Sequence, residues 1–510
     1  MKSELAPSYT QFEHLYNKGE TQIVYLKYNA DFDTALGAYY KITKDKPYSL
    51  LLESVEGGAH IGRYSIIASN PDQIWQVTQG LITTSNAQGE TILSEAISAD
   101  NTPIDSLRAH IKQCHISAIP DDIPPVCTGG LFGYLGYEMV RYYESSIPDE
   151  NADTLDIPEA VMMRPQMLAV FDNVKHELTL AVPILKTAQN STDSAQSCYD
   201  HAKHLIDQAC SDLQGALPVH MTQSTTKLSL PLKTKRNFTD ETFKDVVRAA
   251  KDHIYAGDVF QVVPSQRFRV DFDLPAIELY RSLRQINPSP FLFHLKMDGF
   301  TLVGSSPEIL VRVQNNEVTI RPIAGTRPRG ATPEEDSALA DELLVDEKER
   351  AEHLMLIDLG RNDVGRVAKI GSVRVSEQFT IERYSHVMHI VSNVVGALKD
   401  DLDCLDALFS GFPAGTVSGA PKVRAMQLIH KFENEKRSFY AGCIGYFDGQ
   451  GNMDTCIALR TALVKNGEII MQAGAGIVAD SDPESENQEC KNKAKALVSA
   501  AEAVIRNHTV

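Results

Sequence analysis

Four glutamates stand in two pairs that could hold a divalent cation. Glu349 and Glu352 are three residues apart, and Glu486 and Glu489 repeat this spacing near the C-terminus. Residues three apart on a helix share a face, so each pair would direct two carboxylates the same way. Such oxygen ligands suit Mg²⁺, which keeps water and substrate oxygens in its shell. The spacing equally fits two solvated helix starts, where the helix dipole favours glutamate.

The stretch 346–363 predicts the helix that would carry the first pair. Its first half is almost wholly charged, and Leu354 to Leu359 is almost wholly apolar, which predicts a buried helix. Carboxylates that lead into a buried helix must be neutralised, because an uncompensated buried charge is costly. In the C-terminal stretch, Lys493 lies one turn beyond Glu489 on the same expected face.

Two glycine-rich segments could offer backbone amides to an anion. The segment from Gly415 to Lys422 has the wrong spacing for a nucleotide-binding P-loop, because three residues separate its glycines and Ala420-Pro421 precedes the lysine. Both this segment and 473–476 are compatible with a cradle for a carboxylate, but glycines in a buried sheet are the commoner explanation. The segment 129–138 predicts tight strand-to-helix packing, since glycine allows close backbone approach.

Single reactive side chains are ambiguous in the sequence. His389 alternates with apolar residues on an expected strand, where a histidine is usually structural and only its context makes it an acid or base. Cys443 lies between glycines but has no supporting histidine, so we interpret it as a core thiol. Glu53 and Ser54 end an apolar strand, where they either cap a turn or form a polar pocket with Arg63.

Composition narrows the class of protein. The chain has 510 residues, 43% hydrophobic and 23% charged, as expected for a globular enzyme of two domains or one large compound fold. A net charge of −18 argues against a nucleic-acid surface. The N-terminus lacks a signal peptide and no segment is long enough to span a membrane. Eight scattered cysteines fit reduced thiols, so we expect a cytoplasmic protein without membrane partners.

The order of the elements predicts an α+β fold with antiparallel sheets. We expect strands at 49–54 and 62–68 around a turn at Gly57-Gly58, two strands within 162–182, and a helix at 194–213. A further helix starts at Thr239, with Phe238 and Phe243 as a hydrophobic staple. The polar segment 215–237 is the predicted linker between an N-terminal domain, 1–214, and a catalytic domain, 238–510.

Several motifs in the second half resemble those of the chorismate-utilising enzymes, and among these the large subunit of anthranilate synthases. The motifs are Phe260 to Arg267, Pro322 to Gly330, Glu352 to Asp363 and Gly419 to Lys422. The similarity runs from about Leu50 almost to the C-terminus. It implies two intertwined domains, whose antiparallel sheets pack together with helices outside.

The resemblance also implies roles for individual residues. Glu308 would be the general acid that protonates the departing C4 hydroxyl of chorismate. Glu352 and Glu489 would ligate Mg²⁺, with Glu349 and Glu486 completing the acidic shell through water. Thr326 and Gln261 would belong to the catalytic set with His389. The residues that would bind the substrate carboxylates are Thr416, Tyr440, Arg460, Gly474, Ala475, Gly476 and Lys493.

Three positions distinguish members of this family by resemblance. Gln261 stands where water-adding isochorismate and salicylate synthases have a lysine base, and Ala324 stands where aminodeoxychorismate synthases often have lysine. His389 matches the histidine associated with pyruvate elimination. These positions favour ammonia as nucleophile and anthranilate as product, the first step of tryptophan biosynthesis. The alternatives are an aminodeoxychorismate synthase large subunit and a non-catalytic chain that binds chorismate or tryptophan.

The resemblance finally implies regulation and a partner. Residues of the N-terminal half and of 287–291 resemble a tryptophan feedback site, although Phe291 replaces a common tyrosine and Leu292 a common methionine. The predicted inhibitor-binding residues are Glu53, Ser54, Arg63, Asn287, Pro288, Ser289, Pro290 and Phe291. We expect ammonia to come from a separate glutamine amidotransferase subunit, in a heterotetramer of two large and two small subunits.

Overall fold

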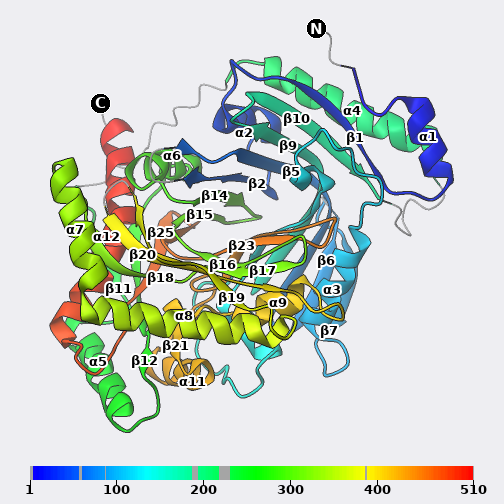
Figure 1. Ribbon diagram of the computed structural model, residues 1–510. Coiled ribbons are helices and arrows are strands. Elements are labelled where there is room, and N and C mark those ends of the chain that lie inside the picture. The colour runs from blue at the N-terminus through cyan, green and yellow to red at the C-terminus, as the bar shows by residue number, and fades with distance from the viewer. Residues whose placement is uncertain are drawn as a thin grey trace.

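The computed structural model describes residues 4–56, 60–86, 88–185, 193–217, 230–384 and 387–508. Within these ranges, 21 strands form one connected antiparallel network with helices packed outside it (Figure 1). This is the α+β architecture predicted from the sequence. The expected turn at Gly57-Gly58 and residues 218–229 of the expected linker lie outside the described residues.

The helices of the described chain, including the short 3₁₀ helices η1 and η2, have the following bounds. They are α1 Tyr9–Asn17, α2 Ala35–Thr43, α3 Pro103–Gln113, η1 Pro125–Thr128, η2 Tyr137–Tyr142, α4 Ala195–Gln214, α5 Asp240–Tyr255, α6 Ala276–Ile286, α7 Pro333–Val345, α8 Glu347–Val367, α9 Cys404–Gly411, α10 Gly415–Ser418, α11 Lys422–Phe432 and α12 Pro483–His508.

The strands fall into an N-terminal and a C-terminal set. The first set is β1 Gln22–Asn29, β2 Ser49–Glu53, β3 Val55–Glu56, β4 His60–Ile61, β5 Tyr64–Thr78, β6 Leu81–Ser85, β7 Thr91–Ala96, β8 Gly130–Leu135, β9 Ala160–Asp172 and β10 Glu177–Ile184. The second set is β11 Lys235–Arg236, β12 Gln261–Val262, β13 Ser265–Asp271, β14 Phe291–Lys296, β15 Thr301–Ser306, β16 Ile309–Gln314, β17 Glu317–Ile320, β18 Ile323–Pro328, β19 Arg374–Arg383, β20 Val387–Ala397, β21 Gly419–Ala420, β22 Cys443–Asp448, β23 Met453–Ile457, β24 Thr461–Lys465 and β25 Glu468–Gly474.

Two ladders join the N-terminal and C-terminal halves of the chain. β2 pairs with β5 of its own half and with β14 of the other half, and these strands lie side by side in the middle of Figure 1. β8 likewise pairs with β9 and with β22. The halves are therefore intertwined, as the resemblance implied. The domain boundary at 215–237 stays a prediction.

Several helices and strands occur where the local sequence predicted them. The Ser194 hydroxyl caps α4 and the Thr239 hydroxyl caps α5, each accepting a hydrogen bond from a backbone amide in the first turn. The rings of Phe238 and Phe243 lie 5.9 Å apart, which confirms the staple. The strand expected at 62–68 is longer than predicted, since β5 continues to Thr78. The extension pairs with both β6 and β9.

The glycine-rich segment 129–138 was predicted to need its glycines for packing of a strand against a helix. β8 does contact α3, but the glycines serve another contact. The segment forms β8 between two other strands, and its glycines let the backbones approach. A Cβ atom at Gly130 would lie 1.9 Å from the carbonyl oxygen of Phe447 in β22, and one at Gly133 would lie 2.0 Å from that of Val161 in β9. The conclusion that glycine is needed for close approach was right, but the neighbour was wrong.

Gly130→Ala is therefore expected to weaken the ladder that joins the two halves. Its φ of 126° lies in the region that disfavours side chains, and the overlap forces a backbone shift, so the free energy of unfolding should fall by about 1–3 kcal/mol. Gly365→Ala is the matched control, because its Cβ would meet open space within α8 and alanine favours helix by roughly 0.5–1 kcal/mol. Urea unfolding measures both, and equal stability of the two variants would contradict the expectation.

Two long helices frame the site described below. α8 packs across β18 and β20, while α12 packs against α5, α6 and β25 (Figure 1). The prediction that the stretch Leu354 to Leu359 of α8 is buried holds only in part: Leu356 and Ile357 are buried, whereas Leu354 is 48% exposed and Asp358 is exposed. A membrane-crossing helix, one long and apolar enough for the task, is absent from the described ranges.

Candidate active site

The centre of the site is a bulge between two paired strands. β18 and β20 run antiparallel, and their register shifts at Gly325, which has a φ of 67°. The shift places Thr326 opposite His389, so that Thr326 Oγ1 lies 3.1 Å from His389 Nδ1. These two predicted catalytic residues are thus brought together by backbone geometry that only a residue tolerant of positive φ adopts easily.

His389 is held as a neutral imidazole of defined tautomer. Burial lowers its pKa to about 4, so the ring is uncharged at neutral pH. Its Nδ1 lies 2.9 Å from the carbonyl oxygen of Gly325. Because a carbonyl oxygen only accepts, Nδ1 carries the proton and Nε2 keeps its lone pair. No described residue hydrogen-bonds to Nε2, which can therefore accept a proton from a substrate.

Glu308 has the opposite character. Its side chain is buried, and burial raises its pKa to about 8. The Thr416 hydroxyl lies 3.1 Å from one carboxyl oxygen and 3.2 Å from the other. A carboxyl group with this pKa is largely protonated at neutral pH, which is the state a general acid requires. Glu308 and Thr416, predicted separately from the sequence, thus meet directly.

Arg460 supplies positive charge beside His389. Its backbone adopts a φ of 47° in the turn before β24, and its carbonyl accepts from the amide of Ser305. Burial lowers the pKa of the guanidinium, whose field acts on both His389 and Tyr384. No carboxylate in the described ranges forms an ion pair with Arg460. Since a partly buried cation needs a counter-charge, an anionic substrate group fits this position.

Gln261 connects the start of α8 with the loop that follows β25. Its Nε2 donates to Glu352 Oε1 at 3.3 Å, and a Cβ at Gly476 would lie 2.7 Å from the same nitrogen. From the other side, Lys493 on α12 donates to the Gly474 carbonyl at 3.0 Å and pairs with Glu489 at 2.7 Å. The loop 474–476 therefore lies between one member of each acidic pair.

The loop offers fewer free amides than predicted. The Ala475 amide donates to the carbonyl of Pro264 at 3.2 Å, so it is already used. The Tyr440 hydroxyl lies beside the Gly474 amide, since a Cβ at Gly474 would be 3.0 Å from the tyrosine oxygen. Gly476 remains as the amide that can turn to a substrate carboxylate.

The two acidic pairs sit in surroundings that favour a cation. Burial and Glu352 raise the pKa of Glu349, whose Oε2 would lie 3.2 Å from a Cβ at Gly325. Burial raises the pKa of Glu486 as well, and Lys348 at the start of α8 acts against this shift. The starts of α8 and α12 are therefore neighbours, as Figure 1 also shows at the lower left. Glu489 itself is exposed.

The described side chains do not form a complete metal site. Within the described ranges, no three His, Cys, Asp or Glu side chains lie close enough to hold an ion. One observation nevertheless fits a cation here: Gln261 Oε1 is buried without a hydrogen-bond partner among the described residues, next to Glu352. The donor set, all carboxylate and amide oxygen, has the chemistry of Mg²⁺ ligands. Mg²⁺ stays a prediction.

A buried ion pair that sequence reasoning missed fixes Tyr440. Arg437 is 1% exposed and pairs with Glu433 at 2.6 Å. Its guanidinium also donates to the carbonyls of Val417 and Val263 and packs 5.5 Å from the Tyr440 ring centre. One side chain thus ties α11, the turn that carries Thr416, and the segment after Gln261. Only long-range packing identifies it, because i, i+4 charge pairs are common on helix surfaces.

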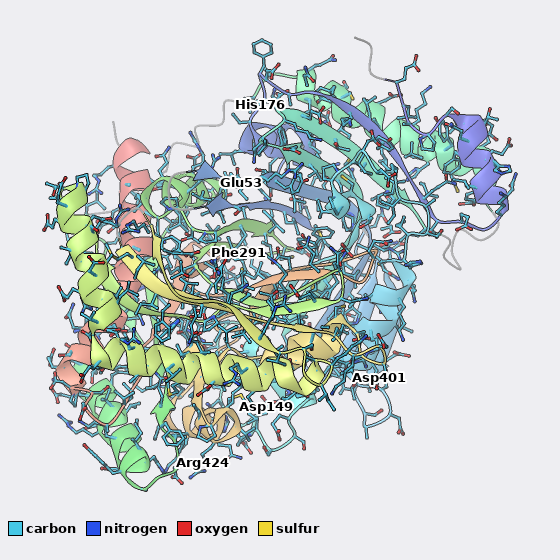
Figure 2. All side chains as sticks on the ribbon, in the orientation of Figure 1. Glu53, Asp149, His176, Phe291, Asp401 and Arg424 are labelled. Atoms are coloured by element: carbon cyan, nitrogen blue, oxygen red, sulfur yellow. The ribbon has the colours of Figure 1, made fainter. Side chains whose placement is uncertain are left out.

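The predicted inhibitor residues gather elsewhere, at the ladder between the halves. A cavity of about 560 Å³ opens there, and Glu53, Ser54, Arg63, Pro290 and Phe291 line it; Figure 2 shows Glu53 and Phe291 in the middle of the molecule. Asn287, Pro288 and Ser289 do not line it. They shape its edge instead, since the Asn287 carbonyl accepts from Ser305 and the Ser289 carbonyl from Val55.

Glu53 already has partners from α6. The Tyr280 hydroxyl donates to one carboxyl oxygen at 2.6 Å, and Arg284 donates to the other at 3.0 Å. Arg63 pairs with Asp172 at 3.1 Å and not with Glu53. The i, i+4 spacing of Tyr280 and Arg284 is the signal that could have indicated a shared partner for these two polar side chains.

Other residues singled out from the sequence are structural. Lys422 forms a buried ion pair with Asp363 at 2.8 Å, so it is not a phosphate ligand. Cys443 is buried in β22 and burial raises its pKa to about 12, which confirms a core thiol. All eight cysteines are free.

The fold and the site define an enzyme of one family. The chorismate binding enzyme family model matches residues 63–499, and the chain belongs to this family. A relative from Cereibacter sphaeroides, named "Anthranilate synthase component 1", is 51% identical over 97% of this chain and 97% of its own length. One of the same name from Aquifex aeolicus is 45% identical over 94% of each chain.

Solved structures agree. Anthranilate synthase component I from Streptococcus pneumoniae TIGR4 is 38% identical, has a TM-score of 0.73, and covers 86% of this chain and 92% of its own. The menaquinone-specific isochorismate synthase from Escherichia coli, 18% identical with a TM-score of 0.67, covers 96% of this chain and 99% of its own and shares the fold. The resemblance inferred from the motifs is confirmed.

Proposed function

We propose that this chain is the large subunit of an anthranilate synthase, converting chorismate and ammonia to anthranilate, pyruvate and water. The observation that carries the proposal is the pair of buried groups with opposite proton states, Glu308 protonated and His389 neutral. The reaction needs one group to give a proton and another to take one. The printed name shared by the relatives supports the same reaction.

The chain's own residues account for the proton transfers. Glu308 donates a proton to the C4 hydroxyl, which leaves as water while ammonia adds at C2. The ammonium group formed at C2 returns one proton to the Glu308 carboxylate. His389 Nε2 then accepts the C2 proton, the ring becomes aromatic, and the C3–oxygen bond breaks. The side chain leaves as the enolate of pyruvate, which takes the proton back from His389. Gly325 fixes the histidine tautomer for this step, since its carbonyl holds the Nδ1 proton.

The choice of nucleophile follows from what the site lacks. Neither Gln261 nor Ala324 has an amine. Neither side chain can therefore act as a base that activates water, or as a nucleophile that bonds to C2 in place of ammonia. Gln261 is instead held by Glu352. These two positions support free ammonia as the nucleophile and disfavour the water-adding reaction.

Substrate binding would use the positive groups around this centre. Arg460, Lys493 and the Gly476 amide would hold the substrate carboxylates, with Thr416 and Tyr440 beside them. Glu352 and Glu489 would hold Mg²⁺, with Glu349 and Glu486 contributing through water. When bound, the ion would neutralise the ring carboxylate and withdraw electrons from the ring.

We further propose a partner and an inhibitor. Ammonia would come from a glutamine amidotransferase subunit, as the component naming of the relatives suggests, in a heterotetramer of two large and two small subunits. Tryptophan would bind in the cavity of about 560 Å³ and inhibit the enzyme. The cavity lies where β2 and β14 pair, so a ligand there touches both halves of the chain.

The test uses the full chain with chorismate, MgCl₂ and ammonium chloride at pH 8. Anthranilate fluorescence and pyruvate are followed together, and we expect equal amounts of both, abolished by EDTA. Chorismate consumed without pyruvate would move the protein to the aminodeoxychorismate synthase class. No consumption would favour a non-catalytic chain that binds chorismate or tryptophan.

His389→Gln separates the two halves of the reaction. Glutamine retains a hydrogen-bonding group but has no basic nitrogen, so the proton at C2 should be removed slowly while ammonia addition continues. We expect pyruvate release to fall by about 10²–10⁴-fold and an aminated intermediate that keeps the enolpyruvyl side chain to accumulate, detected by mass spectrometry. A parallel loss of chorismate consumption and pyruvate would contradict this role. His294→Gln, a buried histidine away from the site, is the control for lost stability.

A further inference from the structure

The inhibitor cavity and the catalytic residues share a wall. Glu308 directs its carboxyl toward Thr416, whereas the residues on either side of it, Pro307 and Ile309, line the cavity. Ile323, which begins the strand carrying Thr326, lines it too. A ligand in the cavity is therefore one layer of side chains away from the catalytic centre.

Tyr384 spans this layer. It lines the cavity and is 7% exposed. Its ring packs against His389 with centroids 5.6 Å apart and planes at 61°. Of the residues that line the cavity, none other in the described ranges makes a ring contact with His389. Tyr384 thus touches the ligand space on one side and the catalytic base on the other.

A tether fixes the Tyr384 ring in place. Its hydroxyl donates to Glu382 Oε2 at 2.8 Å, and Glu382 forms an ion pair with Arg321. Both partners also line the cavity. The far side is fixed by Arg329, which donates to the Tyr384 carbonyl at 2.6 Å. An amino-acid ligand brings a carboxylate that competes with Glu382 for Arg321, and this competition would loosen the tether.

We propose that Tyr384 transmits occupancy of the cavity to His389. When the ligand's carboxylate takes Arg321, Glu382 no longer holds the hydroxyl, the ring shifts, and His389 loses the packing that aims Nε2 at the substrate. Such coupling requires that the ligand prefer the loosened arrangement over the tethered one. The inference rests on the proposed tryptophan inhibition and names the residue through which it acts.

Tyr384→Phe removes the hydroxyl that forms the tether but keeps an aromatic ring at this position. Tyr446→Phe is the matched control, because Tyr446 also lines the cavity yet its ring stacks on Phe132. With the full chain, calorimetry measures tryptophan binding and the pyruvate assay measures the activity left at saturating tryptophan. Because its ring is already untethered, we expect Tyr384→Phe to have lower activity than the unaltered chain without tryptophan, to bind tryptophan within about threefold of it, and to lose most of the further inhibition. Tyr446→Phe should remain fully inhibited.

A spectroscopic signal makes the test independent of catalytic rate. In protein with labelled histidine rings, the His389 Cε1–Hε1 resonance is assigned by its absence in His389→Gln. Tryptophan should shift this resonance in the unaltered chain and in Tyr446→Phe, but not in Tyr384→Phe. A purely structural role for Tyr384 would leave the ligand-dependent shift intact.

The outcomes separate the two proposals. If the unaltered chain does not bind tryptophan, the feedback part of the proposed function fails and the role of Tyr384 fails with it. If tryptophan binds and inhibits the unaltered chain and Tyr384→Phe alike, feedback stands and only the role of Tyr384 is overturned. Equal loss of inhibition in Tyr446→Phe would also overturn it, because the effect would then belong to the cavity as a whole.

Discussion

Glu308→Gln is expected to lower kcat for anthranilate formation by about 10²–10⁴-fold. Glutamine has almost the same shape and can still accept a hydrogen bond from the Thr416 hydroxyl. It cannot donate an acidic proton to the leaving hydroxyl. Binding of chorismate, measured by calorimetry, should change little, because the loss concerns the transition state. Unchanged turnover would remove Glu308 from the role of acid.

The raised pKa of Glu308 gives the same variant a second signature. In the folded protein the carboxyl keeps its proton up to a pH of about 8, whereas in the unfolded chain it loses the proton near pH 4.5. The folded state therefore binds more protons in this window, and stability falls as pH rises through it. At pH 5 the melting temperature of Glu308→Gln should therefore be close to that of the unaltered chain. At pH 9 it should be higher than that of the unaltered chain.

Glu317→Gln is the control for both readings. Glu317 lies in β17 and pairs with Arg374 at the surface, so neither its activity nor the pH dependence of its melting should differ from the unaltered chain. Activity is compared at constant free ammonia, because ammonium deprotonates over the same alkaline range and would otherwise hide the effect of Glu308.

Loss of the proposed Mg²⁺ ligands is expected to have a comparable effect. Glu352→Gln and Glu489→Gln should each reduce activity at 1 mM Mg²⁺ by at least about 100-fold, since removal even of an outer partner of a metal ligand costs 10–100-fold. Calorimetric titration with MgCl₂ in the presence of chorismate gives a readout separate from turnover, and the affinity for the ion should fall in both variants.

Each variant has a control on its own helix. Glu347 precedes Glu352 by five residues on α8 and is exposed, and Glu484 precedes Glu489 by five residues on α12 and pairs with Lys244 at the surface. Glu347→Gln and Glu484→Gln carry the same change of charge, so they show what general electrostatics contributes. Equal loss in the controls, or full activity of the unaltered chain in EDTA, would rule out the assigned ligands.

Residue spacing predicted those parts of the site that lie on single elements. The glutamate pairs occur at the starts of α8 and α12 as expected, because i, i+3 spacing fixes a common helix face whatever the tertiary structure. The Thr239 cap of α5 was predictable for the same local reason. The family, and through it the roles, came from the motifs Phe260 to Arg267, Pro322 to Gly330, Glu352 to Asp363 and Gly419 to Lys422.

Contacts between distant segments were not predictable in this way. Nothing in the sequence near Tyr384 indicates that its ring contacts His389, because this contact depends on the pairing of β19 with β20. The role of Arg437 likewise depends on hydrogen bonds to carbonyl groups 20 and 174 positions away in the chain. The exposure of Leu354 was misjudged because hydropathy gives the content of a helix but not which face the sheet covers. The bulge at Gly325 likewise depends on the register of its partner strand.

The pairing of β8 with β22 also bears on how the chain is made. Six largely apolar residues, Gly130–Leu135, acquire their second neighbour only when Cys443–Asp448 has been synthesised. At about 5–20 residues per second, the ribosome needs roughly 15–60 s to add the intervening stretch. During that interval one side of β8 is an open strand edge, and one side of β2 is open until β14 has been synthesised. Open strand edges are sites of aggregation. We therefore expect the nascent chain to need protection from aggregation until nearly nine-tenths of it has been synthesised, and expression of either half alone should yield insoluble protein.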